Sequence, residues 1–134
     1  MASIKEIINI DSQSVERLHD AGIRTLEQLL EIGATSAGRM HLADQTRLDN
    51  AIIKNWVHEA DLMRVNGMSP ELAHLLLGAG VSTTPKLAYR TTDSLHAELI
   101  ERNRDSKMMG RLPGIAELHQ YIVAAKSLPK LIRH

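Results

Sequence analysis

The residues best suited to binding chemistry form one short segment near the middle of the chain, Val65-Asn66-Gly67-Met68-Ser69-Pro70. Ser69 and Pro70 predict a helix start, because serine caps helices through its hydroxyl and proline is tolerated at the first helical position. Backbone N–H groups at a helix N-terminus bind anions such as phosphate. Gly67, Met68 and Ser69 therefore form a candidate phosphate-binding turn. The alternative is an ordinary capped turn that fixes the angle between two helices.

Basic residues on both sides of this turn could supply positive charge. Arg64, Lys86 and Arg90 would flank it if the neighbouring helices pack around the turn. A second basic patch lies further along the chain, interrupted by Asp105, and consists of Arg102, Arg104, Lys107 and Arg111. A solvated loop is the simpler interpretation of this patch, since runs of charge are usually solvated. If it lies beside Gly67, it would add charge for contacts to a nucleic-acid backbone.

Charge is unevenly distributed along the chain although it sums to zero. Sixteen Lys and Arg balance sixteen Asp and Glu over 134 residues. Residues 1–67 contain seven basic and ten acidic side chains, and residues 68–134 contain nine and six. A polyanion is therefore expected to bind the second half. With no Phe, one Trp and two Tyr, the chain offers little aromatic surface for stacking of single-stranded bases.

The histidines and acidic residues predict neither a metal site nor an active site. The seven histidines include no pair at the i, i+4 spacing of a helical metal site, and the chain has no cysteine. His58 and Asp61 lie three residues apart on an expected helix, where an exposed pair is a simpler interpretation than half a metal site. No strand-turn-helix elbow or glycine-rich loop frames a Ser-His-Asp triad. We expect no enzyme activity, no cofactor and no small-molecule substrate.

Two apolar patterns at helical spacing, in residues 12–21 and 70–79, each end just before a glycine. Gly22 and Gly80 are placed where a left-handed residue ends a helix, a conformation that glycine takes without steric cost. In such a turn the residue after the glycine packs on an apolar residue of the last helical turn. The pairs that would do so are Leu18 with Ile23 and Leu76 with Val81. Both segments therefore predict a helix with a hydrophobic closing contact.

Further hydroxyl residues predict the starts of other helices. Thr25 with Gln28 matches a capping box, and Thr46 with Asp49 resembles one. Longer helices are expected at about residues 47–64 and 114–127. No segment alternates polar and apolar residues with the β-branched enrichment of a strand. The sequence predicts an all-α fold.

The two halves of the chain match at a nearly constant offset, as in a duplicated unit. The alignment that places Gly22 on Gly80 also places Leu18 on Leu76, and a slightly larger offset places Trp56 on Tyr121. The additional residues of the second half fall in the polar stretch 102–110. We expect two tandem units with the boundaries 1–64 and 65–134, packed with capping helices as one compact domain. Trp56 and Tyr121 are then better interpreted as core packing between the copies than as exposed anchors.

The first half carries a degraded version of the candidate turn, Ile8-Asn9-Ile10-Asp11-Ser12, which has no glycine. Asp11 would cap the following helix and would also place a negative charge where a phosphate would sit. We expect this turn to be structural. A third turn, Leu112-Pro113-Gly114 beside Arg111, is either another hairpin or a simple helix start.

The order of a capped short helix, an Ala-Gly-Ile turn and a second helix opening with Thr-x-x-x-Leu resembles helix-hairpin-helix proteins. Their DNA-binding turn reads apolar-Gly-apolar-Gly. Gly67 and Met68 match this pattern, and Ser69 replaces the second glycine. A more extensive resemblance is to the domain-of-unknown-function 4332 family. The matching segments are residues 56–67, 75–76, 79–83 and 87–90, with 38–39 and 42–43 upstream and 112–113, 121–122 and 125–126 downstream. This resemblance implies a fold but no function.

The sequence therefore predicts a non-enzymatic, helix-hairpin-helix-type binding module. Its second unit is expected to bind the DNA backbone weakly and without sequence preference. The alternative is a protein-interaction, self-association or scaffold module with no nucleic-acid role. The absence of a long apolar run and of a signal-peptide pattern leads us to expect a cytoplasmic protein that does not bind membranes.

Overall fold

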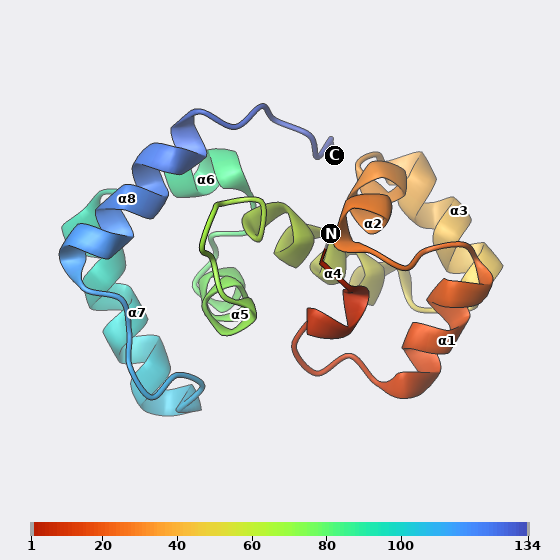
Figure 1. The fold of residues 1–134 in the computed structure, drawn as a ribbon, viewed down its shortest axis with the longest axis horizontal. Coiled ribbons are helices and arrows are strands. Elements are labelled where there is room, and N and C mark those ends of the chain that lie inside the picture. The colour runs from red at the N-terminus through yellow and green to blue at the C-terminus, as the bar shows by residue number, and fades with distance from the viewer. Residues whose placement is uncertain (1, 134) are drawn as a thin grey trace. The chain divides into compact units, whose positions relative to one another are not determined.

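The structure, a computed structural model, describes residues 2–133, and its elements in this range are helices joined by turns and loops (Figure 1). A short 3-10 helix and eight α-helices follow one another without a β-strand between residues 2 and 133. In chain order they are η1 (Ile4–Glu6), α1 (Ser12–Asp20), α2 (Leu26–Gly33), α3 (Ser36–Thr46), α4 (Asn50–Leu62), α5 (Pro70–Gly78), α6 (Thr84–Ala88), α7 (Thr92–Ser106) and α8 (Ile115–Lys126). An isolated antiparallel bridge joins Ser3 and Thr25. The predicted all-α class is confirmed. Within the described range, no helix is both long and apolar enough to cross a membrane.

The chain divides into two compact units. The first contains residues 1–61 and 131–134, and the second contains residues 62–130. This division lies three residues before the boundary expected at residue 64, and the C-terminal segment groups with the first unit. The backbone gives the reason, because the Arg133 N–H donates to the Ala34 carbonyl at 2.6 Å. The expected packing of the two units as one domain stays a prediction.

In the first unit a buried arginine holds the C-terminal segment. Arg39 of α3 is only 4% exposed, and its guanidinium donates to the carbonyls of Gly33 at 2.8 Å and of Arg133 at 3.2 Å. Burial lowers the pKa of Arg39 from its usual value. Helices α1 and α2 both pack on α3, and α2 closely approaches α4 where Gly33 meets Val57. A side chain larger than hydrogen at Gly33 would overlap Val57.

In the second unit an aliphatic core joins all of the helices. Helix α5 packs on α7. Helix α8 packs on both α6 and α7, and Figure 1 shows it beside them. The fully buried side chains at the centre are Leu62, Ala73, Leu76, Leu87, Leu95, Leu99 and Leu118. Met109, Leu112 and Tyr121 pack against this core from its edge. Burial of these side chains supplies the main driving force for folding of the unit.

Both units form the same backbone hydrogen bonds at positions that correspond in the sequence alignment of the two halves. The turn before α1 is closed by Ile7 N–H to Ile4 O at 3.1 Å, and the turn before α5 by Val65 N–H to Leu62 O at 3.1 Å. At the other end of these helices, Ile23 N–H donates to Leu18 O at 2.8 Å. The second unit repeats that bond as Val81 N–H to Leu76 O at 2.9 Å. The backbone of the two segments is therefore built in the same way.

The predicted glycine terminators are confirmed. Gly22 and Gly80 have φ values of +87° and +86°, in the left-handed region. Leu18, Ile23, Leu76 and Val81, which were expected to form the closing contacts, are all buried. The bonds from Ile23 to Leu18 and from Val81 to Leu76 are those that define a Schellman turn. The local sequence was sufficient here because every partner lies within about one and a half helical turns.

Three sequence expectations differ from the structure. Thr46 does not cap α4, because it ends α3, where its hydroxyl donates to Leu42 O at 2.7 Å. Asp49 provides the α4 cap instead, by accepting the Ala51 N–H at 2.8 Å. Helix α3 itself was not predicted, since its apolar residues do not gather on one face. The third difference is the extent of α7, which places Arg102 and Arg104, two of the four residues of the basic patch, on a helix.

Candidate functional site

The candidate turn lies between α4 and α5 and is held by its own backbone. Met68 N–H donates to Val65 O at 3.0 Å, and both of these side chains are buried. Gly67 lies between them, exposed, with φ +86°. This positive φ explains why glycine occupies the position, since most other residues are strained there. The turn thus exposes Gly67 between two buried apolar side chains.

Helix α5 begins at this turn with the predicted cap. The Ser69 hydroxyl oxygen accepts the Leu72 N–H at 3.1 Å, and Pro70 takes the first helical position. The hydroxyl hydrogen of Ser69 remains available as a donor. Glu71 is exposed in the first turn of α5. Its carboxylate interacts favourably with the helix dipole and would repel an anion at the same place.

Tyr121 of α8 contacts the turn, which the sequence comparison did not anticipate. Its hydroxyl donates to the Gly67 carbonyl at 3.3 Å. Its ring is near enough that a Cβ added to Gly67 would lie 3.7 Å from Cε1. Burial, and then the charge of Glu117, raise the pKa of Tyr121 above its usual value of 10.0. The phenol is therefore a protonated donor at neutral pH.

A hollow of about 200 Å³ lies beside the turn, between α5, α8 and the segment that precedes α8. Gly67 and Ser69 contribute to its lining, together with Arg111 from the predicted basic patch. The remaining lining residues are Leu72, Met109, Leu112, Pro113, Glu117 and Tyr121. The structure thus brings one arginine of the patch to the hollow beside the turn. Glu117 places a carboxylate in the same hollow.

The three basic residues expected to flank the turn are not among the lining residues of this hollow. The Arg64 guanidinium donates to Pro129 O at 2.9 Å. Lys86 is exposed on α6, and its ammonium donates to the Ser82 hydroxyl at 3.2 Å. Arg90 forms an ion pair with Glu98 at 3.0 Å. The charge of Arg90 is therefore directly balanced by a carboxylate.

Half of the basic patch is helical, which corrects the expectation of a solvated loop for Arg102 and Arg104. Helix α7 continues to Ser106, so that Arg102 and Arg104 lie exposed on its last turns. Lys107 ends the helix in the left-handed region with φ +51°, and its N–H donates to Asn103 O at 2.7 Å. The Asn103 amide then fixes the following segment through two bonds to the Met109 backbone, both 2.8 Å long.

The charges of the patch point to different places. Arg104 pairs with Glu101 at 3.2 Å, and both side chains are about two-thirds exposed. Arg102 and Asp105 line a separate hollow of about 330 Å³ with His74 and Met108. The patch predicted from the sequence is therefore divided, and Arg111 is its member at the Gly67 turn.

The family is shown by a sequence model described as Domain of unknown function (DUF4332), which matches residues 9–128. The chain belongs to this family. The match spans the Gly67 turn, the hollow beside it and most of both units. No curated protein and no solved structure matches the chain. Membership in the DUF4332 family thus agrees with the predicted resemblance.

The first unit of this DUF4332 chain has a turn of the same geometry before α1. Asn9 occupies the place of Gly67 and also has a positive φ, +64°. Ile10 N–H donates to Ile7 O at 3.3 Å, as Met68 does to Val65. Asparagine tolerates this region better than most non-glycine residues, which explains how the turn forms without glycine.

Asp11 caps α1, as the sequence predicted. Its carboxylate accepts the Ser14 N–H at 3.3 Å. Hydrogen bonding to Ser14 lowers the pKa of Asp11 from its usual value of 3.8. The negative charge thus stands where the second unit has the neutral Ser69 hydroxyl. The third turn has a simpler form, because Gly114 directly precedes α8 and has no side-chain cap.

His58 and Asp61 are not the exposed pair expected from the sequence. His58 is 5% exposed and Asp61 is 1% exposed, because this face of α4 is buried. In residues 2–133 no group of three or more His, Cys, Asp or Glu side chains is arranged to hold a metal ion.

Proposed function

We propose that this protein is a non-enzymatic binding module whose second unit holds the phosphate backbone of duplex DNA weakly and without sequence preference. The proposal treats residues 4–29 and 62–87 as two copies of a helix-hairpin-helix-like unit. Their matching hydrogen bonds, at corresponding positions of the two copies, support this interpretation. The Gly67 turn of the second copy then takes the place of the phosphate-binding hairpin.

One observation carries the proposal, namely that Arg111 lines the same hollow as Gly67 and Ser69. A phosphate oxygen at this place could accept from the backbone at the start of α5 and from the Ser69 hydroxyl. Arg111 would add a charge-assisted, bidentate contact to the same phosphate group. Residues 62–130 contain more basic than acidic side chains, so that this unit is the one with a net positive charge.

The acidic side chains around the hollow limit the expected affinity. Glu117 lines the hollow, and Glu71 is exposed on the first turn of α5. Both would repel a phosphate, so binding is expected to be weak and to be measurable mainly at low salt. The groups named at the turn are proposed to contact phosphate and not base edges. We therefore expect binding without sequence preference.

The test is a salt titration of binding to a fluorescent duplex, followed by anisotropy. Arg111→Gln should weaken binding and reduce the log–log salt slope by about 1. Arg24→Gln is the matched control, because Arg24 is exposed in the other unit and does not line the hollow. Undetectable binding of the unmodified chain at low salt would reject the proposal. If both variants change the salt slope equally, DNA does not bind at the hollow beside the Gly67 turn.

A protein-interaction module is the second candidate, and exposed apolar side chains in the same unit favour it. Tyr89 is 88% exposed at the end of α6. Ile115 and Val123 of α8 are 51% and 47% exposed. Aromatic side chains in particular are enriched at interfaces between proteins. A mass that rises with concentration in light scattering, and that falls in Tyr89→Ser, would support this candidate. A monomer at every concentration would count against self-association.

A further inference from the structure

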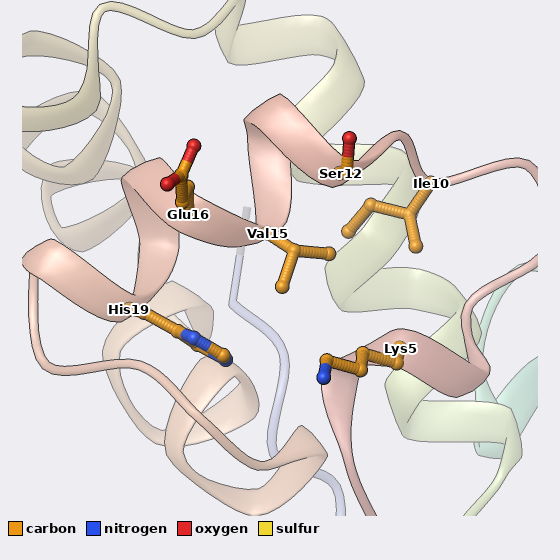
Figure 2. A pocket seen from close by; sticks show the side chains of 6 residues that line it. All are labelled: Lys5, Ile10, Ser12, Val15, Glu16 and His19. Carbon is orange, nitrogen blue, oxygen red and sulfur yellow. The ribbon is translucent and has the colours of Figure 1, made fainter.

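A large hollow of the first unit lies between η1 and α1, far along the sequence from the Gly67 turn. Its volume is about 600 Å³, within the range of sites that bind small ligands or chain ends. Six residues line it, namely Lys5, Ile10, Ser12, Val15, Glu16 and His19 (Figure 2). Four of the six are polar and two are aliphatic. The hollow thus offers both kinds of contact that a small amphipathic ligand needs.

Two nitrogen-bearing side chains face one another across this hollow. In Figure 2, Lys5 extends from η1 and His19 from α1, and their tips point toward each other below Val15. Lys5 is exposed and His19 is partly buried. Among residues 2–133, neither side chain takes part in a hydrogen bond or ion pair within the chain. Their donors are therefore available to an anionic group placed between them.

The second unit indicates that Lys5 and His19 are not needed to build the fold. In the alignment that places Gly22 on Gly80, their counterparts are Met63 and Leu77. The backbone there forms the same turn and the same helix, with matching hydrogen bonds. The second unit thus forms this turn and helix with apolar side chains, whereas the first unit has two potential hydrogen-bond donors at the corresponding positions. This difference points to a role outside folding.

The other lining residues restrict the charge and shape of the ligand. Val15 is 8% exposed and Ile10 is half-buried, so that an apolar chain between them would lose water on binding. Glu16 lines the hollow and points away from the Lys5–His19 gap in Figure 2. Asp11 caps α1 next to Ser12. These two carboxylates disfavour a doubly charged phosphate more than a singly charged carboxylate.

We propose that the hollow between η1 and α1 binds a single carboxylate carried on a short aliphatic chain. Lys5 and His19 hold the carboxylate, and Ile10 and Val15 contact the aliphatic part. The carboxylate can come from a free monocarboxylic acid or from the C-terminus of a peptide with an apolar last residue. This proposal is independent of the DNA-binding proposal, since it uses other residues in the other unit.

The experiment is a titration of the ¹⁵N-labelled full chain, followed through its amide NMR signals. The probes are pentanoate, acetylated glycyl-alanyl-valine with a free carboxylate, and the same peptide as its C-terminal amide. Pentanoate or the free acid should shift the signals around Val15 and His19, and the amide should bind more weakly. Binding of the free acid well above that of pentanoate identifies a peptide terminus as the source, and equal binding identifies a free monocarboxylate.

The variants copy the second unit. Lys5→Met and His19→Leu should each weaken binding by about two- to fivefold, as expected for contacts to a partly exposed charge. Lys54→Met is the control, because Lys54 is exposed on α4 and does not line the hollow. Amide signals far from the hollow report whether each variant is folded. The proposal is overturned if no probe shifts these signals, if the amide binds as well as the acid, or if Lys54→Met weakens binding as much as Lys5→Met.

Discussion

The turn before α1 and the turn before α5 have the same backbone but different side-chain chemistry. Asn9 and Gly67 both have positive φ, and the hydrogen bonds on either side of them match between the two units. The cap is Asp11 in one turn and Ser69 in the other. A shared turn geometry therefore does not imply a shared ligand, because the cap decides whether a negative charge already occupies the place of a phosphate.

The side chains around the two turns also differ. The second turn is contacted by Tyr121 and shares a hollow with Arg111. Beside the first turn, the hollow instead contains Lys5 and His19 on an aliphatic base. The two turns therefore share a backbone geometry and differ in the side chains that surround them.

The prediction with the largest expected effect compares how much a buried leucine contributes to the stability of each unit. Leu18 and Leu76 are both fully buried and occupy equivalent positions in α1 and α5. Leu18→Ala and Leu76→Ala should each lower the free energy of unfolding by about 2–5 kcal/mol. Urea unfolding measures the loss, with Trp56 fluorescence reporting the first unit and hydrogen exchange reporting both. A loss below about 1 kcal/mol in one variant alone would show that the two cores are not equivalent.

The second prediction exchanges the residues at positive φ. Gly67→Val places a β-branched residue in the left-handed region and should cost about 1–3 kcal/mol of stability. Gly67→Asn should cost less, because Asn9 adopts the same region in the first unit. Chemical unfolding of both variants checks the order. Equal losses of stability in Gly67→Val and Gly67→Asn would contradict the view that asparagine tolerates the positive φ of this turn.

The third prediction converts the second cap into the first. Ser69→Asp should leave stability nearly unchanged, since Asp and Ser are comparable caps. Its charge should weaken DNA binding by about fivefold if a phosphate lies close to the cap. The measurement is anisotropy at low salt, with Ser69→Asn as the uncharged control. Should Ser69→Asp bind like the unmodified chain, the phosphate does not lie at this turn.

The fourth prediction removes the contact that only the second turn has. Tyr121→Phe deletes the hydrogen bond to Gly67 O and should lower stability by about 0.5–1 kcal/mol. Because the folded pKa of Tyr121 is raised, the contribution of its protonated form is complete below pH 10.0 and is lost as pH rises through the folded value. Unfolding at neutral pH measures the loss. A Tyr121→Phe variant as stable as the unmodified chain would show that ring packing alone holds the turn.

The smallest expected effect concerns the first cap. The folded pKa of Asp11 is lowered, so the stability that it contributes is present above pH 3.8 and is lost as pH falls through the folded value. Asp11→Ala should therefore be less stable than the unmodified chain at neutral pH, and the difference should shrink in acid. Unfolding midpoints at neutral pH and below pH 3.8 provide the comparison. A difference that is the same at both pH values would contradict a role for the carboxylate charge.

Short stretches of sequence were enough to predict the helical class and the ends of several helices. Gly22, Gly80 and the capping box of Thr25 with Gln28 were correctly placed. Helix α4 begins at Asn50 and α8 at Ile115, close to the expected starts. These features depend on partners within about one and a half helical turns, and their chemistry is therefore visible in a few neighbouring residues.

Only the folded structure shows which side chains lie at or beside the turn. Tyr121 lies 54 residues from Gly67 in sequence, and Arg111 lines the hollow beside the same turn from the segment before α8. Arg90, expected at the turn, is instead paired with Glu98 on α7. Long-range contacts of this kind follow from how helices pack, and packing depends on the shape of the whole core. The sequence therefore proposed the Gly67 turn as a candidate, whereas the arrangement of the helices places Tyr121 against it and Arg111 in the hollow beside it.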